Sequence, residues 1–499
     1  MTRTALAAIG TSITLMVVVG AGGPSPGVGV RAFSAAPPWP PWFVHVSTSP
    51  VLVSAVLWLA GALGAVGLTA ALVAARRGWR PRPRRLILGS VVAVAALMVI
   101  PPVGSNDMLV YVAGGRIAVL GHSPYVMTPG QLMSSGDPIG TGTVFTYPDV
   151  PSPYGPVATV TEAAASELGG TSVARTLFWL KVWDALAYLA LVVVLDRMVR
   201  SDAARRVRAH LLWSVNPLML FEMMASGHND VLAAAAGLSA LLALRRVGSR
   251  RGLLAGILLG LAAAIKVPYL LFGAGLIWCA RRSPRALAAL ALGTAAALVP
   301  GYLWGGRAAI SATWGIAAKP PIGPSPWILP VLMLQKMLNW HPSYARIDTL
   351  SLIGSAVLAA VLLARMPPGP RDLPAVRVAL AATLALLVLS PQQQPWYAAL
   401  IFPLLAVFPA SRLDWVAVTF AAAQAVGMLP FLYFKGLHPA WLAKEVMTGE
   451  LGIVLLCVTE AGFTLLWLCF INGWRPVTDL GAPVEVGPGD FDTGIASPN

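Results

Sequence analysis

The amino-acid sequence predicts an all-α, polytopic membrane protein with about 12–14 transmembrane helices. Its composition is 57% hydrophobic and only 11% charged, whereas soluble proteins have about 25% charged residues. The chain also contains many apolar runs close to the length of about 20 residues that a helix needs to cross the hydrocarbon core. Finally, its basic residues gather in alternate loops between these runs, which is typical of membrane topology.

Fourteen apolar runs are candidates for the helices. In chain order they are Ala5–Val19, Val51–Ala75, Leu86–Val103, Thr171–Leu195, His210–Ala225, Asp230–Leu244, Gly252–Ile265, Pro268–Ala280, Ala286–Trp304, Leu350–Ala364, Ala375–Leu389, Tyr397–Ala410, Trp415–Tyr433 and Leu451–Ile471. The shorter runs fit helices that end in a polar cavity. Met1–Gly23 also has the basic start and small residues of a signal peptide, but we expect a retained anchor.

The arginine-rich loops predict the orientation. With the amino terminus inside, most of the 35 lysines and arginines fall in cytoplasmic loops. We therefore interpret the net charge of +15 as a topology signal and expect no nucleic-acid partner. The three cysteines, Cys279, Cys457 and Cys469, lie in apolar runs and show neither metal-ligand spacing nor a disulfide framework.

This topology divides the chain into four parts. Residues 1–104 form the N-terminal transmembrane helices, and residues 105–170 form a large extracytoplasmic loop. Residues 171–471 form a transmembrane core with short outer loops, and residues 472–499 form a disordered cytoplasmic tail rich in Pro, Gly and Asp. Most aromatic, histidine and acidic residues outside the helices fall in outer loops, so we expect the chemistry there.

The first candidate site residue is Asp107, which directly follows the apolar run Leu86–Val103. An ionisable carboxylate at a membrane surface is costly and therefore indicates function. Asp107, Tyr111 and the pair Gly114 and Gly115 are three to four residues apart, so they share a face if the segment is helical. The Pro- and Gly-rich segment Thr146–Pro156 predicts a folded loop with fixed turns, and it contains Tyr154.

The next outer turn, Ser226–Asp230, reads SGHND. Asn229 or Ser226 could cap the following helix by accepting from its free backbone N–H groups. Alternatively, His228, Asn229 and Asp230 contribute to a polar pocket, because this cluster exceeds what capping needs.

Two further outer turns carry candidate residues. Lys266 and Pro268 interrupt the apolar stretch Gly252–Ala280, so we expect the chain to reverse there. The Lys266 ammonium then either reaches lipid phosphates or binds a substrate phosphate. The turn LSPQQQPWY offers the amides of Gln393 and Gln394 and the rings of Trp396 and Tyr397 to a sugar, although aromatic residues are also typical of membrane interfaces.

These segments resemble a known family. The layout resembles the GT-C glycosyltransferases, and within them the actinobacterial polyprenol-phosphate-mannose-dependent alpha-1,6-mannosyltransferases. The resemblance extends from about Ser105 to Tyr397 and is carried by SNDMLVYVAGGRIAVLGHSPYV, PSPYGP, NPLMLFEMMASGHND, GLAAAIKVPYLL and SPQQQPWY.

The resemblance implies a GT-C-like bundle in the cell membrane, with an active site of outer loops facing away from the cytoplasm. It implies polyprenyl-phosphate mannose as donor, a hydroxyl of a glycolipid, lipoglycan or mannan as acceptor, and inversion at the anomeric carbon. It maps the catalytic carboxylate to Asp107, with Asp137, Asp149 and Glu162 as substitutes in the same loop.

Chemistry suggests roles for the remaining candidates. Transfer from a glycosyl phosphate needs a base for the acceptor hydroxyl, which we assign to Asp107, and cations for the departing phosphate. Arg116 and Lys266 are the candidates for the phosphate. We expect Tyr111 and Tyr154 to contact substrate.

We predict neither a metal nor another cofactor. Asp107, His228 and Asp230 would suit a hard divalent ion if they converged, but the resemblance does not require one. No nucleotide-binding motif is present, so the sugar should arrive on a lipid.

Two alternative functions stay open. The chain could use another polyprenyl-phosphate sugar, such as arabinose or glucose, or it could be a membrane transporter. Against transport, polar residues cluster in outer loops instead of in the middle of helices, and no inverted repeat is evident.

Overall fold

A computed structural model describes residues 2–23, 39–44, 46, 49–145, 147–314, 321, 325–366, 368–369 and 373–428. Regular structure in this part of the chain is helical, which confirms the predicted all-α membrane bundle. Five of its helices are long and apolar enough to cross a membrane: Thr2–Ala21, Leu52–Arg76, Val173–Val199, Pro284–Thr313 and Tyr344–Arg365. The predicted helix Leu451–Ile471, Cys457, Cys469 and the predicted tail lie outside the described residues.

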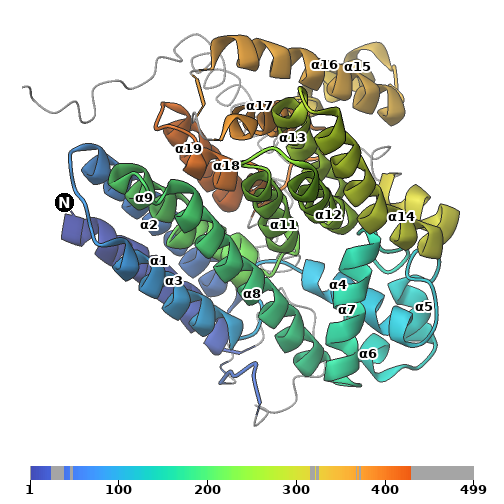
Figure 1. Cartoon of the computed structure of the whole chain (residues 1–499). Helices are drawn as coiled ribbons and strands as arrows, with labels where there is room; N and C mark the ends of the chain where they lie inside the picture. Colours follow the sequence, from blue (N-terminus) through green and yellow to red (C-terminus); the bar gives the residue numbers. More distant parts are fainter. Residues whose placement is uncertain are drawn as a thin grey trace, which may run out of the picture.

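The N-terminal half begins with a group of long helices that lie side by side (Figure 1). Helix α1 packs on α2, and α3 packs on α8. Their bounds are α1 (Thr2–Ala21), α2 (Pro50–Arg76), α3 (Pro83–Met98) and α8 (Val173–Val199).

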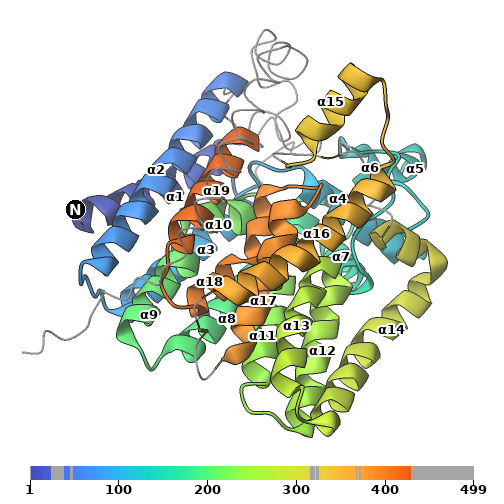
Figure 2. The ribbon, with the colours of Figure 1, turned by 90° about the horizontal axis from the view of Figure 1, so that it is seen from above.

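A second group of helices follows, seen together from above in Figure 2. Its members are α11 (Asp230–Ala243), α12 (Ser249–Ile265), α13 (Phe272–Ala280), α14 (Pro284–Trp314), α16 (Tyr344–Arg365) and α17 (Pro374–Leu389). Helix α12 packs on both α11 and α14, while α17 packs on α13 and α16. The remaining helices of this half are α15 (Ile328–Leu338), which the sequence analysis did not predict, α18 (Phe402–Val407) and α19 (Leu413–Met428).

Small residues allow α12 and α14 to approach closely. Gly252, Gly256 and Gly260 follow one another at intervals of four, so they lie on one face of α12. A Cβ atom at Gly252 would lie 2.6 Å from the carbonyl oxygen of Ala286, and one at Gly260 would lie 2.6 Å from that of Thr294. This is the small-residue interface by which membrane helices pack in the absence of water.

Residues 105–170, which we predicted to be a large extracytoplasmic loop, form a compact group of helices. It contains α4 (Asp107–Val119), α5 (Pro129–Ser134), α6 (Pro138–Thr141) and α7 (Pro156–Gly169). These helices gather at one end of the molecule, and α7 packs on both α4 and α8 (Figure 1). Asp107 and Tyr111 fall on α4, so the helix on which their shared face depended is present.

The prediction of one helix over His210–Ala225 was wrong. After α9 (Ala203–Ala209), the chain forms a π-helical turn η1 (His210–Ser214), the short helix α10 (Pro217–Leu220) and a second π-helical turn η2 (Phe221–Ala225). Pro217 lacks a backbone N–H and cannot continue the preceding turn. The Asn216 side chain instead accepts from Leu218 N at 3.0 Å and starts a new one.

The expectation that polar residues avoid helix centres was also incomplete. Lys181 and Asp184 lie within the membrane-spanning helix α8 and are almost completely buried. Lys181 Nζ donates to the carbonyl oxygen of Ile100 at 2.9 Å. That bond satisfies a free carbonyl beyond the end of α3.

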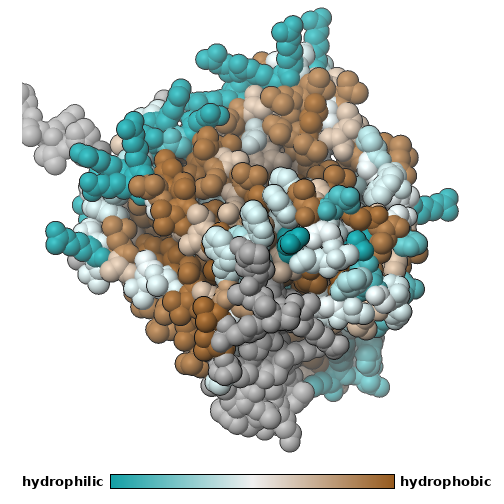
Figure 3. All heavy atoms as spheres, turned by 90° about the horizontal axis from the view of Figure 1, so that it is seen from below, coloured by the Kyte–Doolittle hydropathy of each residue, from teal (hydrophilic) through white to brown (hydrophobic). Residues whose placement is uncertain are grey.

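The surface matches a lipid-facing bundle. Figure 3 shows apolar side chains over much of one face, with hydrophilic ones towards its margins. Large apolar side chains are exposed on several long helices, among them Leu88, Leu186, Leu303, Leu352 and Val357. Because lipid tails are as apolar as these side chains, this exposure is favourable in a membrane.

Candidate active site

The turn before Asp107 is fixed against the SGHND turn. Val103 N donates to the carbonyl oxygen of Ala225 at 2.7 Å, and Ser226 Oγ donates to the carbonyl oxygen of Val103 at 3.0 Å. Gly104 has a φ of +102°, and a Cβ atom there would lie 2.7 Å from the ring of Phe221. Only glycine fits this turn without strain.

A second backbone link joins the PSPYGP loop to Lys266. Gly155 N donates to the carbonyl oxygen of Ile265 at 3.0 Å, directly after Tyr154. Helix α12 ends at Ile265, Lys266 is extended, and a 3₁₀ turn η3 (Val267–Leu271) follows. The break that Lys266 and Pro268 predicted is confirmed.

These links bring together a carboxylate, a cation and two tyrosines. Tyr154 Oη donates to Asp107 Oδ2 at 3.2 Å, and the Tyr154 ring lies 5.7 Å from Lys266 Nζ. Lys266 Nζ donates to Asp230 Oδ2 at 2.5 Å, so it pairs with a fully buried carboxylate. Tyr111 packs edge-on against Tyr154, with ring centroids 4.8 Å apart.

The environment of Asp107 suits a general base. Burial raises its pKa to about 6, although the nearby charge of Lys266 and the hydrogen bond from Tyr154 both lower it. The side chain is 20% exposed, so one side of the carboxylate stays open. A carboxylate with this pKa is ionised near neutral pH and is a stronger base than an ordinary aspartate.

His228 is fully buried beside Asp107. Its ring stacks on Trp396, with centroids 3.9 Å apart and planes at 19°. Nδ1 lies 3.8 Å from Asp107 Oδ2, and Nε2 lies 3.9 Å from Glu222 Oε2. Burial and the charge of Lys266 lower the pKa of His228, so the imidazole is neutral.

The capping interpretation of the SGHND turn was wrong. Asn229 occupies the N-cap position of α11 but makes no side-chain capping bond, and the Ser226 hydroxyl binds Val103 instead. Both polar atoms of the Asn229 amide are buried and have no hydrogen-bond partner within the described part of the chain. This amide therefore has hydrogen-bonding capacity that the described residues do not use.

The glutamine-rich turn divides into structural and available groups. Gln393 is buried, donates to the carbonyl oxygen of Leu387 and accepts from Gln424 at 3.1 Å. Gln394 Oε1 has no hydrogen-bond partner among the described residues. Trp396 is covered by His228, whereas the Tyr397 ring lies 5.0 Å from Lys266 Nζ.

Arg116 lies away from this cluster. It is nine residues after Asp107 on α4, about 13 Å along the helix axis. Its guanidinium donates twice to Asp137 Oδ2, at 2.7 and 2.9 Å. Its predicted contact with a donor phosphate would require that ion pair to open.

Glu222 is a member of this cluster that the sequence analysis did not single out. It is 1% exposed and lies on η2, six residues before His228. A lone carboxylate in the apolar run His210–Ala225 was the available signal. In the described ranges, no three His, Cys, Asp or Glu side chains form a group suited to a metal ion, including Asp107, His228 and Asp230.

A comparison with known protein families places this site in context. The family model described as alpha-(1->6)-mannopyranosyltransferase, N-terminal domain, matches residues 7–282, more than half of the chain. The chain belongs to this mannopyranosyltransferase family. The matched span contains Asp107, Tyr154, Glu222, His228 and Lys266, and it ends before the glutamine-rich turn.

Individual family members are distant. The chain is 24% identical to the alpha-(1->6)-mannopyranosyltransferase A of Mycobacterium tuberculosis over 77% of its length and 78% of that protein. It is 24% identical to the alpha-(1->6)-mannopyranosyltransferase B of Corynebacterium glutamicum over 28% of its length and 23% of that protein. The matches to the Corynebacterium protein and to two further mycobacterial relatives each span only about a quarter of the relative's length.

Proposed function

We propose that this protein is a membrane glycosyltransferase that moves mannose from polyprenyl-phosphate mannose to a hydroxyl group of a glycolipid or lipoglycan. The proposed product has an alpha-1,6 linkage, formed with inversion at the outer face of the cell membrane. The observation that carries the proposal is the position of Tyr154 between the Asp107 carboxylate and the Lys266 ammonium, inside the span that matches the family.

In the proposed reaction, Asp107 accepts the proton of the acceptor hydroxyl. The oxygen forms a bond to the anomeric carbon of mannose while the bond from that carbon to the phosphate oxygen breaks. The leaving group is polyprenyl phosphate, whose negative charge Lys266 stabilises. An ammonium has three N–H donors, so Lys266 can keep its bond to Asp230 and still donate to a phosphate.

The neighbouring polar groups fit a sugar. The unpartnered amide of Asn229 and the Gln394 side-chain oxygen can bind hydroxyl groups. Tyr397 and Tyr154 contribute aromatic rings beside Lys266. We propose that these four residues hold the mannosyl group, while Trp396 supports the site through His228.

The test is transfer of labelled mannose from polyprenyl-phosphate mannose to membrane acceptors by the wild type and by Asp107→Asn. The wild type should form product, and the variant should lose about 10²–10⁴-fold in rate, as expected for a general base. If Asp107→Asn transfers mannose at the wild-type rate, Asp107 is not the general base.

Competing functions require their own controls. Transfer from polyprenyl-phosphate arabinose or glucose in place of the mannose donor would identify a transferase of another sugar. Uptake of mannose into sealed vesicles would identify a transporter. If the correctly inserted wild type transfers sugar from none of these donors, the proposed function is contradicted.

A further inference from the structure

Glu222 lies beside the candidate site but has no role in the proposed reaction. It is 1% exposed, and neither carboxyl oxygen has a hydrogen-bond partner within the part of the chain that the structure describes. Among the described residues, the basic nitrogen within 4 Å of its carboxylate is His228 Nε2, 3.9 Å from Oε2. A buried carboxylate with no cation bonded to it is very costly, so burial favours the neutral acid.

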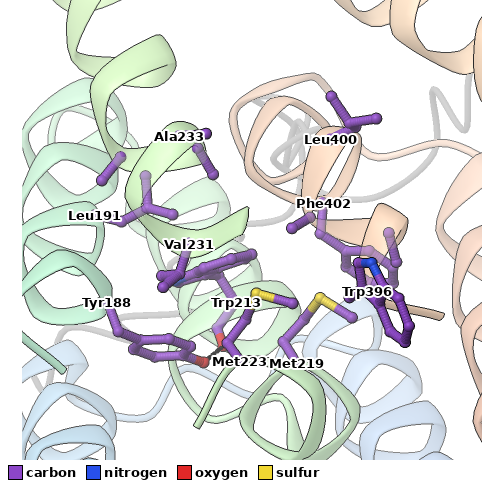
Figure 4. Close-up of a cluster of buried hydrophobic side chains, with 14 of the residues drawn as sticks. Tyr188, Leu191, Trp213, Met219, Met223, Val231, Ala233, Trp396, Leu400 and Phe402 are labelled. Atoms are coloured by element: carbon purple, nitrogen blue, oxygen red, sulfur yellow. Dashed lines mark hydrogen bonds between the residues drawn. The ribbon is translucent and has the colours of Figure 1, made fainter. Parts of the chain in front are cut away.

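The imidazole of His228 separates Glu222 from Asp107. Nδ1 faces Asp107 and Nε2 faces Glu222, at 3.8 and 3.9 Å. Stacking on Trp396 sets the plane of the ring. Trp396 belongs to a buried apolar cluster that also contains Met219 and Met223 (Figure 4), so the stacked His228 ring has little freedom to turn.

The order of the three groups determines which nitrogen carries the hydrogen. A neutral imidazole has one N–H donor and one acceptor nitrogen. The Asp107 carboxylate accepts only, so Nδ1 should be the donor, and the lone pair of Nε2 then points at Glu222. A lone pair attracts a donor, which a protonated carboxyl group supplies and a carboxylate does not.

We propose that Glu222 is a positioning residue: a neutral acid that donates to His228 Nε2 and thereby directs the Nδ1–H group at the Asp107 carboxylate. This inference rests on the proposed role of Asp107 as base. At 3.8 and 3.9 Å the two contacts are longer than hydrogen bonds, so neither His228 nitrogen has a hydrogen-bond partner among the described residues. Catalytic hydrogen bonds are often long in structures without substrate and tighten when substrate binds. The π-helical turn η2 places Glu222 opposite the ring, as π-turns often do at functional sites.

Two substitutions of similar size test the proposal. In Glu222→Gln the amide still donates to Nε2, whereas Glu222→Met cannot donate. We expect Glu222→Gln to keep kcat/KM for mannosyl transfer within about threefold of wild type, and Glu222→Met to lose about tenfold, the equivalent of one hydrogen bond.

The pH dependence distinguishes positioning from packing. Without the Nδ1–H donor, the Asp107 carboxylate is less stable, so the acid limb of kcat/KM should move to higher pH in Glu222→Met and stay unchanged in Glu222→Gln. Lys266, Asp230 and Tyr154 also face Asp107, but they are the same in every variant. Ser166→Ala, which removes a buried α7 hydroxyl that has no hydrogen-bond partner among the described residues, should leave the limb in place.

A spectroscopic measurement makes the test independent of turnover. The ¹⁵N chemical shifts of labelled His228 should report the Nδ1–H tautomer in wild type and in Glu222→Gln, and a loss of that preference in Glu222→Met. Equal loss of activity in the Gln and Met variants would indicate an ionised Glu222 and overturn the proposal. An Nε2–H tautomer in wild type would overturn it as well, whether or not the protein transfers mannose.

Discussion

Asp107 is the residue on which the proposed chemistry depends, and its surroundings make its ionisation measurable. Burial raises its pKa to about 6, while Lys266 and Tyr154 favour the ionised form. A general base works only when it is deprotonated. Activity should therefore be absent well below that pKa and complete well above it.

We predict that kcat/KM for transfer rises with pH through about 6 and then levels off. In Tyr154→Phe the carboxylate loses a hydrogen-bond donor, so the pKa of Asp107 should rise and the limb should move to higher pH. The measurement is the pH profile of both proteins with polyprenyl-phosphate mannose. A limb that moves to lower pH in the variant would contradict the assignment.

The role of Lys266 can be separated from its structural pairing with Asp230. Lys266→Met should weaken donor use, but it also leaves the buried Asp230 carboxylate without a cation, which costs about 3–5 kcal/mol. We predict that the double variant with Asp230→Asn regains thermal stability and still has a raised KM for donor. Recovery of wild-type KM for donor in the double variant would show that Lys266 has only a structural role.

At the scale of elements, α12 and α14 depend on glycines for their contact. We predict that Gly256→Leu lowers the free energy of unfolding by at least about 1–3 kcal/mol, because no side chain fits against the α14 backbone. Gly10→Leu on α1 is the matched control, since a Cβ atom there meets nothing within 4 Å. Thermal unfolding in detergent measures both, and equal melting temperatures would contradict the prediction.

A buried ion pair joins α9 to α19. Arg208 binds Asp414 through two hydrogen bonds, and Arg76 of α2 reaches the same carboxylate at 3.2 Å. Asp414→Asn should destabilise the protein by about 3–5 kcal/mol, because it leaves buried guanidinium charge unpaired. Arg206→Ala, which breaks a partly exposed pair with Asp196, should cost only about 0–1 kcal/mol. Melting temperatures of the two variants should differ accordingly.

At the scale of the whole molecule, the arginine pattern predicts that the arginine-rich loops and the candidate site lie on opposite sides of the membrane. The α4–α7 group should lie outside, and the connection between α8 and α9 should lie inside. In a cysteine-free background, Ser134→Cys on α5 should react with an impermeant thiol reagent in intact cells, whereas Ser201→Cys should react only after lysis. Both side chains are exposed. The reverse pattern would overturn the topology.

Much of the bundle was predictable because each membrane helix is indicated by its own run of apolar residues and by the charges that flank it. The break at Lys266 followed from proline and charge, and the spacing of Asp107 and Tyr111 gave a shared face on condition that the segment is helical. The apolar run His210–Ala225 was wrongly predicted to be one helix, because hydropathy does not show where a proline divides a run into π-helical turns. Helix α15 was missed because its 11 residues are too few for the membrane-spanning length that we searched for.

The sequence by itself determined the class, most of the helices, the resemblance and the candidate carboxylate, because these depend on local composition and motif. Only the tertiary structure decided which candidates meet. It paired Lys266 with Asp230, assigned Gln393 to a structural role, placed Arg116 with Asp137, and set Glu222 beside His228. Such contacts join residues far apart in the chain, and helix packing brings them together in a way that no local pattern encodes.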